Sequence, residues 1–160
     1  MTKKYLNKIL NARVYDVARE TPLDDANTLS QRLGNRILIK REDLQPVFSF
    51  KVRGAYNKLI GLSEADKKKG VIAASAGNHA QGVALSAQKL GVKATIVMPV
   101  TTPEIKVQSV AKWKPEIILH GDDFQETYSH AMGIAAKRHL TFVHPFDDPE
   151  VIAGQGTVGM

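Results

Sequence analysis

The stretch Ser49–Ala55, SFKVRGA, decides how the rest of the chain is interpreted. Ser49 is a favourable N-cap for the helical run that follows, so Lys51 falls in a first helical turn, where the helix dipole disfavours a cation. Apolar residues flank Lys51, and Arg53 lies two residues further on. Lost hydration and like-charge repulsion lower the pKa of such an amine toward a neutral nucleophile, which can form a Schiff base. A solvated surface lysine is the alternative, because most lysines in proteins are exposed.

A second stretch, Ser75–Gly82 (SAGNHAQG), follows the run VIAA at 71–74, which predicts a short buried strand. A helix is predicted from about residue 79 to 90, so the loop lies where the carboxyl end of a strand meets a helix N-terminus. Backbone N–H groups point into such a corner and bind anions. Gly77 permits a tight turn, and Asn78 offers both a donor and an acceptor, which suits a carboxylate and a cofactor hydroxyl. A helix cap without any ligand is the equal alternative.

Length and composition are those of one globular domain, with 160 residues, 43% hydrophobic and 24% charged. No apolar run reaches the length of a membrane span, and the N-terminus lacks the apolar core of a secretory signal, so a cytoplasmic protein is expected. The absence of cysteine excludes disulfides and cysteine-based metal sites, and without an HExxH pattern no metal is expected. The net charge of +6 is spread along the chain, so no nucleic-acid partner is expected.

Hydrophobic spacing predicts the order of the elements. Apolar residues recur every three or four positions from Tyr5 to about Ala18, which predicts an amphipathic helix, and a short helix is expected around Asn27 to Leu33. Strands are predicted at 36–41, 71–74, 94–99, 116–121 and 140–145. From Ser49 onward these strands alternate with helices. The pattern predicts an α/β fold with a parallel sheet and helices on both of its faces.

Four blocks of this sequence resemble the fold-type II pyridoxal-phosphate enzymes, and specifically the threonine dehydratases. The blocks are KREDLQPVFSFKVRGAYNKL, SAGNHAQGVALSAQKLGVKATIVMP, HGDDF and HPFDDPEVIAGQGT, and they occur in that family's order over most of the chain. The opening YLNKILNARVYDVARETPL is similar to the biosynthetic branch of the family, which serves isoleucine synthesis.

The resemblance implies specific roles for residues of both stretches. Lys51 would carry pyridoxal 5′-phosphate as a Schiff base, Asn78 would hydrogen-bond to the 3-hydroxyl of the cofactor, and Phe50 would pack against its ring. The substrate carboxylate would be held by the loop residues Ser75, Ala76, Gly77, Asn78 and His79. The implied reaction is the deamination of L-threonine to 2-oxobutanoate and ammonia. A serine dehydratase or racemase of the same fold is the alternative.

The resemblance also implies a division of the chain. Residues 1–41 would belong to a larger domain, residues 42–151 would form the smaller α/β domain, and residues 152–160 would begin the return to the larger domain. The glycine-run loop that binds the cofactor's phosphate in related enzymes would follow Met160. An N-terminal fragment of a homo-oligomeric enzyme is therefore expected, and a non-catalytic α/β domain is the alternative for these 160 residues alone.

Several motifs suggest other functions but fit structural roles better. Gly154–Gly159 has the spacing GxGxxG, but no strand leads directly into it, so a close-packed helix is expected instead of a nicotinamide site. The pairs Asp122–Asp123 and Asp147–Asp148 stand where helices begin, which favours capping over acid catalysis. Lys114-Pro115 replaces the glycine-rich turn usual in the family, and Phe48 stands where relatives often have a polar residue.

Overall fold

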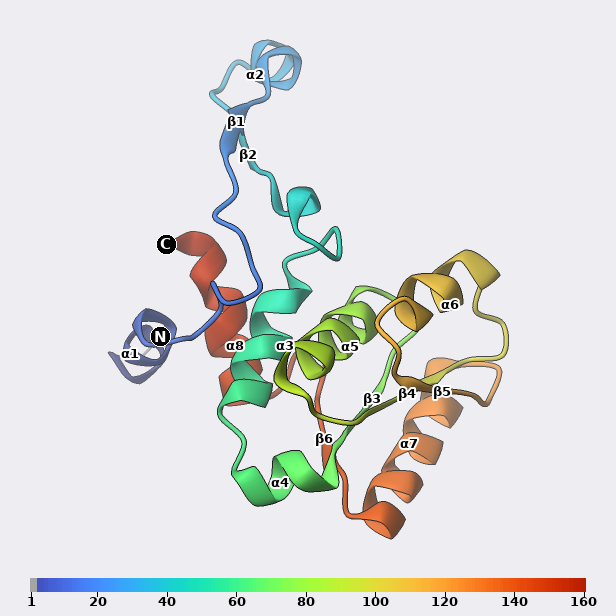
Figure 1. Cartoon of the computed structure of the whole chain (residues 1–160). Helices are drawn as coiled ribbons and strands as arrows, with labels where there is room; N and C mark the ends of the chain where they lie inside the picture. The colour runs from blue at the N-terminus through green and yellow to red at the C-terminus, as the bar shows by residue number, and fades with distance from the viewer. Residues whose placement is uncertain (1–2) are drawn as a thin grey trace.

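The computed structural model describes residues 3–160 and shows an α/β body from which a narrow arm extends (Figure 1). The elements in chain order are α1 (Lys3–Leu10), β1 (Leu23–Asp25), α2 (Asn27–Leu33), β2 (Leu38–Lys40), η1 (Glu42–Leu44), α3 (Lys51–Ile60), α4 (Glu64–Lys69), β3 (Val71–Ala74), α5 (Asn78–Leu90), β4 (Ala94–Met98), α6 (Glu104–Ala111), β5 (Glu116–Leu119), α7 (Phe124–Arg138), β6 (Thr141–Phe142), α8 (Pro149–Gly156) and η2 (Thr157–Gly159). None of the helices within this range is both long and apolar enough to cross a membrane.

The body is built on a four-stranded sheet with the order β5-β4-β3-β6, in which every neighbouring pair is parallel. Val71 of β3 lies opposite Ala94 of β4 on one side and Thr141 of β6 on the other. The predicted parallel sheet is confirmed. Strand β6 is shorter than the predicted 140–145, because the chain turns at His144, whose Nδ1 accepts the N–H of Asp147 at 2.7 Å.

Successive side chains of the central strands enter two different cores. Val71 and Ala73 of β3 pack with residues of α3 and α5, whereas Ile72 and Ala74 pack with Ala131 and other residues of α7. Because side chains of a strand alternate between its faces, both faces of β3 are buried and its sequence is uniformly apolar. Helices therefore cover both faces of the sheet, as predicted.

The first helix is shorter than the predicted span to Ala18, since α1 ends at Leu10. Tertiary contacts replace the continuing helix. The N–H of Arg13 donates to Oδ1 of Asn57 in α3 at 2.9 Å, and Val14 is buried against Val47, Val52 and Leu85. The segment after α1 is thus drawn onto α3, and its apolar spacing reflects burial in an irregular conformation.

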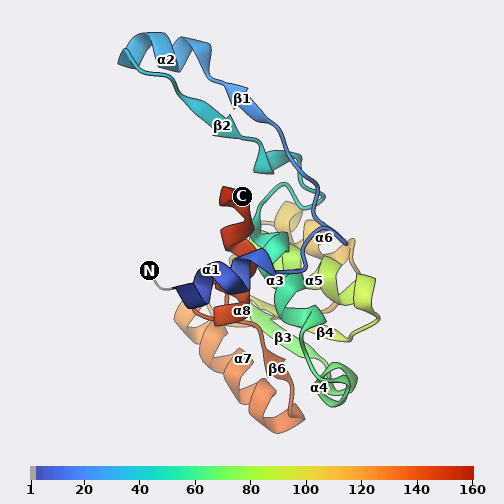
Figure 2. The ribbon, with the colours of Figure 1, turned by 90° about the vertical axis from the view of Figure 1, so that its left-hand side faces the viewer.

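The segment 23–40 forms the arm, which extends from the body in both views (Figures 1 and 2). The strand predicted at 36–41 is reduced to β2, which pairs antiparallel with β1 and lies outside the main sheet. Helix α2 has its predicted bounds and ends at Gly34, whose φ of 60° suits a residue without a side chain.

The motifs assigned to structural roles behave as expected. Asp123 caps α7 by accepting the N–H of Glu126, and Asp148 caps α8 by accepting the N–H of Glu150 and of Val151. A Cβ atom on Gly154 would lie 2.6 Å from the carbonyl oxygen of Arg53, so this glycine allows α8 to pack closely on α3. The GxGxxG spacing therefore reflects close helix packing.

Candidate active site

Lys51 is the first residue of α3, and its side chain is half-buried. Its Nζ donates a hydrogen bond to the carbonyl oxygen of Pro145, beyond β6, at 2.7 Å. The predicted N-cap is displaced by one residue, because Phe50 occupies the cap position without a side-chain bond. The hydroxyl of Ser49 still accepts the N–H of Lys51 at 3.2 Å, which helps to fix the start of the helix.

Burial lowers the pKa of the Lys51 amine. The direction agrees with the sequence-based prediction, but the expected repulsion by Arg53 is wrong, because burial alone accounts for the shift. Arg53 points away into a buried ion pair with Glu42. A larger neutral fraction of Lys51 at a given pH makes its Nζ a better nucleophile and a better proton acceptor.

The Arg53–Glu42 pair is a feature that sequence reasoning missed. Arg53 is 1% exposed, and its guanidinium donates to both carboxylate oxygens of Glu42 at 2.8 Å. It also donates to the carbonyl oxygen of Arg19 and to the hydroxyl of Thr157, so it joins the N-terminal segment, α3 and η2. The sequence does show an arginine in the first turn of a helix that has no acidic residue in that turn. It does not show that Glu42 is the partner of this arginine.

The loop Ser75–Gly77 connects β3 to α5. The N–H of Ser75 still bonds to Val97 of β4, and the N–H of Gly77 donates to the hydroxyl of Ser75 at 3.2 Å. Helix α5 begins at Asn78, one residue before the predicted start, and no side chain caps it. Among residues 3–160, no side chain accepts from the first-turn N–H groups of this 13-residue helix, so these groups can bind an anion.

Asn78 and His79, the first two residues of α5, point to different environments. Asn78 is exposed, whereas His79 is 3% exposed and its Nε2 lies 2.9 Å from the carbonyl oxygen of Val143. Burial lowers the pKa of His79 to about 4, so the ring is neutral near pH 7. Because a carbonyl oxygen only accepts, the ring proton sits on Nε2, and Nδ1 has no partner within residues 3–160. The side chain of His79 therefore fixes α5 against the end of β6.

Gly82 brings the two stretches together. It lies four residues after Asn78, and a Cβ atom there would be 3.1 Å from the carbonyl oxygen of Lys51. The start of α3 can approach the first turns of α5 this closely because Gly82 lacks a side chain. Lys51 and His79 also bond to carbonyl oxygens only two residues apart, at Pro145 and Val143. Sequence reasoning did not identify Gly82 or Pro145, although both lie within the quoted motif blocks.

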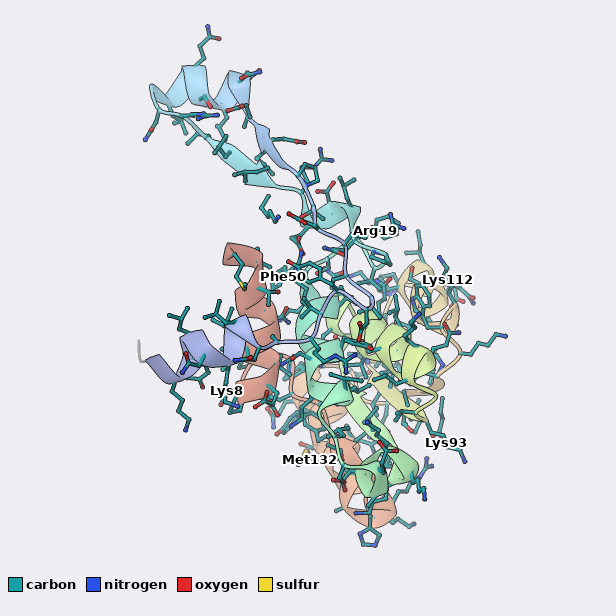
Figure 3. The ribbon with its side chains drawn as sticks, turned by 60° about the vertical axis from the view of Figure 1, so that its left-hand side comes forward. Lys8, Arg19, Phe50, Lys93, Lys112 and Met132 are labelled. Carbon is teal, nitrogen blue, oxygen red and sulfur yellow. The ribbon has the colours of Figure 1, made fainter. Side chains whose placement is uncertain are left out.

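The candidate site is open to solvent. The Phe50 side chain is 40% exposed, its ring centroid lies 5.6 Å from Nζ of Lys51, and Figure 3 shows it near the start of α3. Ser75, Ala76 and Gly77 are each half-buried. The site thus offers three groups: the half-buried amine of Lys51, the exposed amide of Asn78 and the uncapped N-terminus of α5. Together they fit an anionic aldehyde cofactor and a substrate carboxylate.

Comparison with known proteins gives the class to which this fold and site belong. Residues 14–160 match the family described as "Pyridoxal-phosphate dependent enzyme". The chain therefore belongs to the pyridoxal-phosphate-dependent enzyme family, as the four sequence blocks predicted.

Within that family the chain is similar to threonine dehydratases. It is 60% identical over 159 residues to the biosynthetic L-threonine dehydratase of Burkholderia multivorans, covering 98% of this chain and 31% of the relative. It is 59% identical over 157 residues to the chloroplastic biosynthetic threonine dehydratase of Arabidopsis thaliana, covering 98% of this chain and 26% of the relative. The chain thus spans between a quarter and a third of the length of these relatives.

Solved structures share the fold. The processed form of threonine deaminase isoform 2 from Solanum lycopersicum superposes with a TM-score of 0.93 at 54% identity, covering 98% of this chain and 46% of that one. A maize serine racemase superposes with a TM-score of 0.91 at 30% identity, covering 95% of this chain and 47% of that one.

Proposed function

We propose that this chain supplies the reactive lysine and the substrate-carboxylate loop of a pyridoxal-phosphate-dependent threonine dehydratase. The observation that supports the proposal is the close approach of the Lys51 backbone to Gly82 in α5, together with the bonds of the Lys51 amine and the His79 ring to the nearby carbonyl oxygens of Pro145 and Val143. Burial also lowers the pKa of that amine, and α5 begins at Asn78 without a side-chain cap among residues 3–160. The identity of 60% to a biosynthetic L-threonine dehydratase supports L-threonine as the substrate.

Each residue of the site has a defined task in this proposal. Pyridoxal 5′-phosphate, when bound, supplies an aldehyde for covalent attachment and an electron sink for negative charge at the substrate Cα. Lys51 would hold the cofactor through its Nζ, and the same nitrogen, when free, would accept the proton from the substrate Cα as a general base. The carbonyl oxygen of Pro145 orients that nitrogen at 2.7 Å. Phe50 would pack against the cofactor ring, and Asn78 would hydrogen-bond to its 3-hydroxyl.

The loop and the start of α5 bind the other end of the substrate. We infer that Ser75, Ala76, Gly77, Asn78 and His79 hold the carboxylate, chiefly through backbone N–H groups, because the side chain of His79 is engaged with Val143. Fixing the carboxylate aligns the Cα–H bond with Nζ of Lys51. The overall reaction converts L-threonine into 2-oxobutanoate and ammonia, the first step of isoleucine biosynthesis.

The remaining proposals concern the whole protein. Residues 1–41 and 152–160 would belong to a larger domain and residues 42–151 to a smaller one, within a cytoplasmic homo-oligomer.

A serine racemase or dehydratase is the second candidate function, supported by the TM-score of 0.91 to the maize enzyme. Turnover of L-serine against L-threonine separates the two. If these 160 residues bind the cofactor without turning over either amino acid, they form a non-catalytic half of the site.

The test is to add pyridoxal phosphate, reduce with borohydride and map the modified lysine by mass spectrometry. Lys51 is expected to carry the label at one cofactor per chain, and the variant Lys51→Ala is expected to lose it. Lys68→Ala, at an exposed position of α4, is the matched control and should label normally. Labelling spread over many surface lysines, and unchanged in Lys51→Ala, would refute the proposal.

A further inference from the structure

A second concentration of functional groups lies at the amino-terminal edge of the sheet, opposite the loop Ser75–Gly77. A cavity of about 380 Å³ opens there. Its polar lining, which we call the amino-edge cleft, consists of Lys69, Lys93, Thr95, Lys114, Glu116 and Arg138. Figure 3 shows Lys93 well apart from Phe50, so this cleft is separate from the candidate active site.

The topology gathers these cations in one place. Lys69 precedes β3, Lys93 precedes β4, Lys114 precedes β5 and Arg138 precedes β6. Parallel strands bring their amino ends to the same edge of a sheet, so four residues that are far apart in sequence line one cavity. No single stretch of the chain carries this cluster, which is why the sequence showed only dispersed positive charge.

The charge of the cleft is not balanced internally. Glu116 is its single carboxylate, and Arg138 donates to both of its oxygens, at 2.8 and 3.1 Å. Lys69 bonds to Asp66 of its own helix at 3.1 Å. Lys93 and Lys114 have no side-chain hydrogen bond or ion pair among residues 3–160. Two ammonium groups, both of exposed residues, thus line the cavity without a side-chain partner in the described part of the chain.

Helix dipoles do not explain these two lysines. Lys69 and Arg138 lie in the last turns of α4 and α7, where cations are favourable. Lys93 and Lys114, by contrast, lie beyond the ends of α5 and α6. Lys114 has a φ of 58°, the left-handed conformation that often ends a helix, and its N–H donates to the carbonyl oxygen of Ala111 at 2.8 Å. This turn sets where Lys114 lies at the rim of the cavity.

A smaller hollow of about 250 Å³ adjoins the cleft and shares Lys93 and Lys114 with it. Trp113, Ala84 and Ala87 contribute its apolar lining. Nε1 of Trp113 is buried without a hydrogen-bond partner in the described part of the chain. The two unpaired lysines thus line both hollows.

We propose that the amino-edge cleft is a second binding site, which takes a small phosphate-bearing molecule. Lys93 and Lys114 bind the phosphate groups by charge-assisted hydrogen bonds, and Arg138 and Lys69 add long-range attraction. The site does not use Lys51 or the loop Ser75–Gly77, so it is independent of the proposed function.

Trp113 provides the measurement, because it is the single tryptophan of the chain and lines the adjoining hollow. Inorganic pyrophosphate is titrated at constant ionic strength while tryptophan fluorescence is recorded, and calorimetry gives an independent dissociation constant. A saturable one-to-one response is expected. The double variant Lys93→Gln/Lys114→Gln should weaken binding at least about tenfold, since each lost hydrogen bond is to a charged group.

The control variant Lys68→Gln/Lys106→Gln removes the same charge from two exposed lysines outside the cleft. It should change the dissociation constant less than about twofold, because screened charges of side chains that do not line the cleft contribute little. Circular dichroism verifies that both double variants are folded. Equal weakening by the two double variants would mean that pyrophosphate is attracted only by the overall positive charge. Full affinity in the Lys93/Lys114 variant would mean that pyrophosphate binds elsewhere. Either result overturns the proposal. The absence of saturable binding to the unmodified chain would also overturn it.

Discussion

A Cβ atom on Gly82 would lie 3.1 Å from the carbonyl oxygen of Lys51. The backbones of α5 and of the start of α3 are therefore in close contact at this point, and a side chain at Gly82 would push them apart. Gly82→Ala is expected to lower the free energy of unfolding by about 1–3 kcal/mol through overpacking. It should also weaken pyridoxal phosphate binding, because the contact moves Lys51. Thermal or urea unfolding and cofactor titration measure the two effects.

Gly133→Ala in α7 is the matched control for Gly82→Ala, because nothing lies within 4 Å of a Cβ atom at that position. This exposed helical glycine should gain up to about 1 kcal/mol of stability from the higher helix propensity of alanine. Equal effects of the two substitutions would show that the Gly82 contact is not tight.

The pair Arg53–Glu42 should contribute strongly to stability, since the side chains are 1% and 10% exposed. Glu42→Gln leaves the buried guanidinium without its counter-charge, and the expected loss of unfolding free energy is about 3 kcal/mol. Glu64→Gln breaks the exposed pair with Lys67 and should cost less than about 0.5 kcal/mol. Urea denaturation of both variants gives the comparison, and a similar small loss in both would contradict the role assigned to Arg53.

His79 should make the fold sensitive to mild acid. Its pKa is about 4 in the folded chain, below the ordinary value of 6.5, so the unfolded chain binds more protons between these limits. Stability is therefore complete above about pH 6.5 and falls as the pH decreases, by about 2 kcal/mol between pH 6.5 and pH 5. Urea denaturation at a series of pH values measures this slope.

His79→Gln removes the titrating ring and should flatten this dependence while lowering stability at pH 7. His130→Gln, on the partly exposed side of α7, is the control and should retain the slope. A slope that persists in His79→Gln would assign the acid sensitivity to another group.

Lys51 should become reactive at a lower pH than an exposed lysine, because burial lowers the pKa of its amine and raises its neutral fraction. Competitive labelling with acetic anhydride over a pH series, followed by mass spectrometry, gives the midpoint for each lysine. The midpoint for Lys51 is expected below that for Lys68, which is exposed on α4. Coincident midpoints would mean that Nζ of Lys51 is fully hydrated in solution.

Local patterns predicted much of the fold correctly. The apolar run VIAA and its three successors predicted the parallel sheet, because strands covered on both faces, such as β3 and β4, are buried along their whole length. Helix α2 and its Gly34 terminus also agreed, since capping depends on neighbouring residues. The helix predicted to Ala18 failed because its apolar residues pack irregularly against α3, and periodicity does not reveal which partner a face will meet.

The sequence alone determined the family, the candidate lysine and the loop that follows β3, because these depend on residue types in short contiguous motifs. Only the tertiary structure decided that Arg53 pairs with Glu42, that Gly82 brings Lys51 beside α5, and that four dispersed cations line one cleft. These relationships join residues that are remote along the chain. Their distances are set by how helices pack and how parallel strands align, which no local pattern encodes.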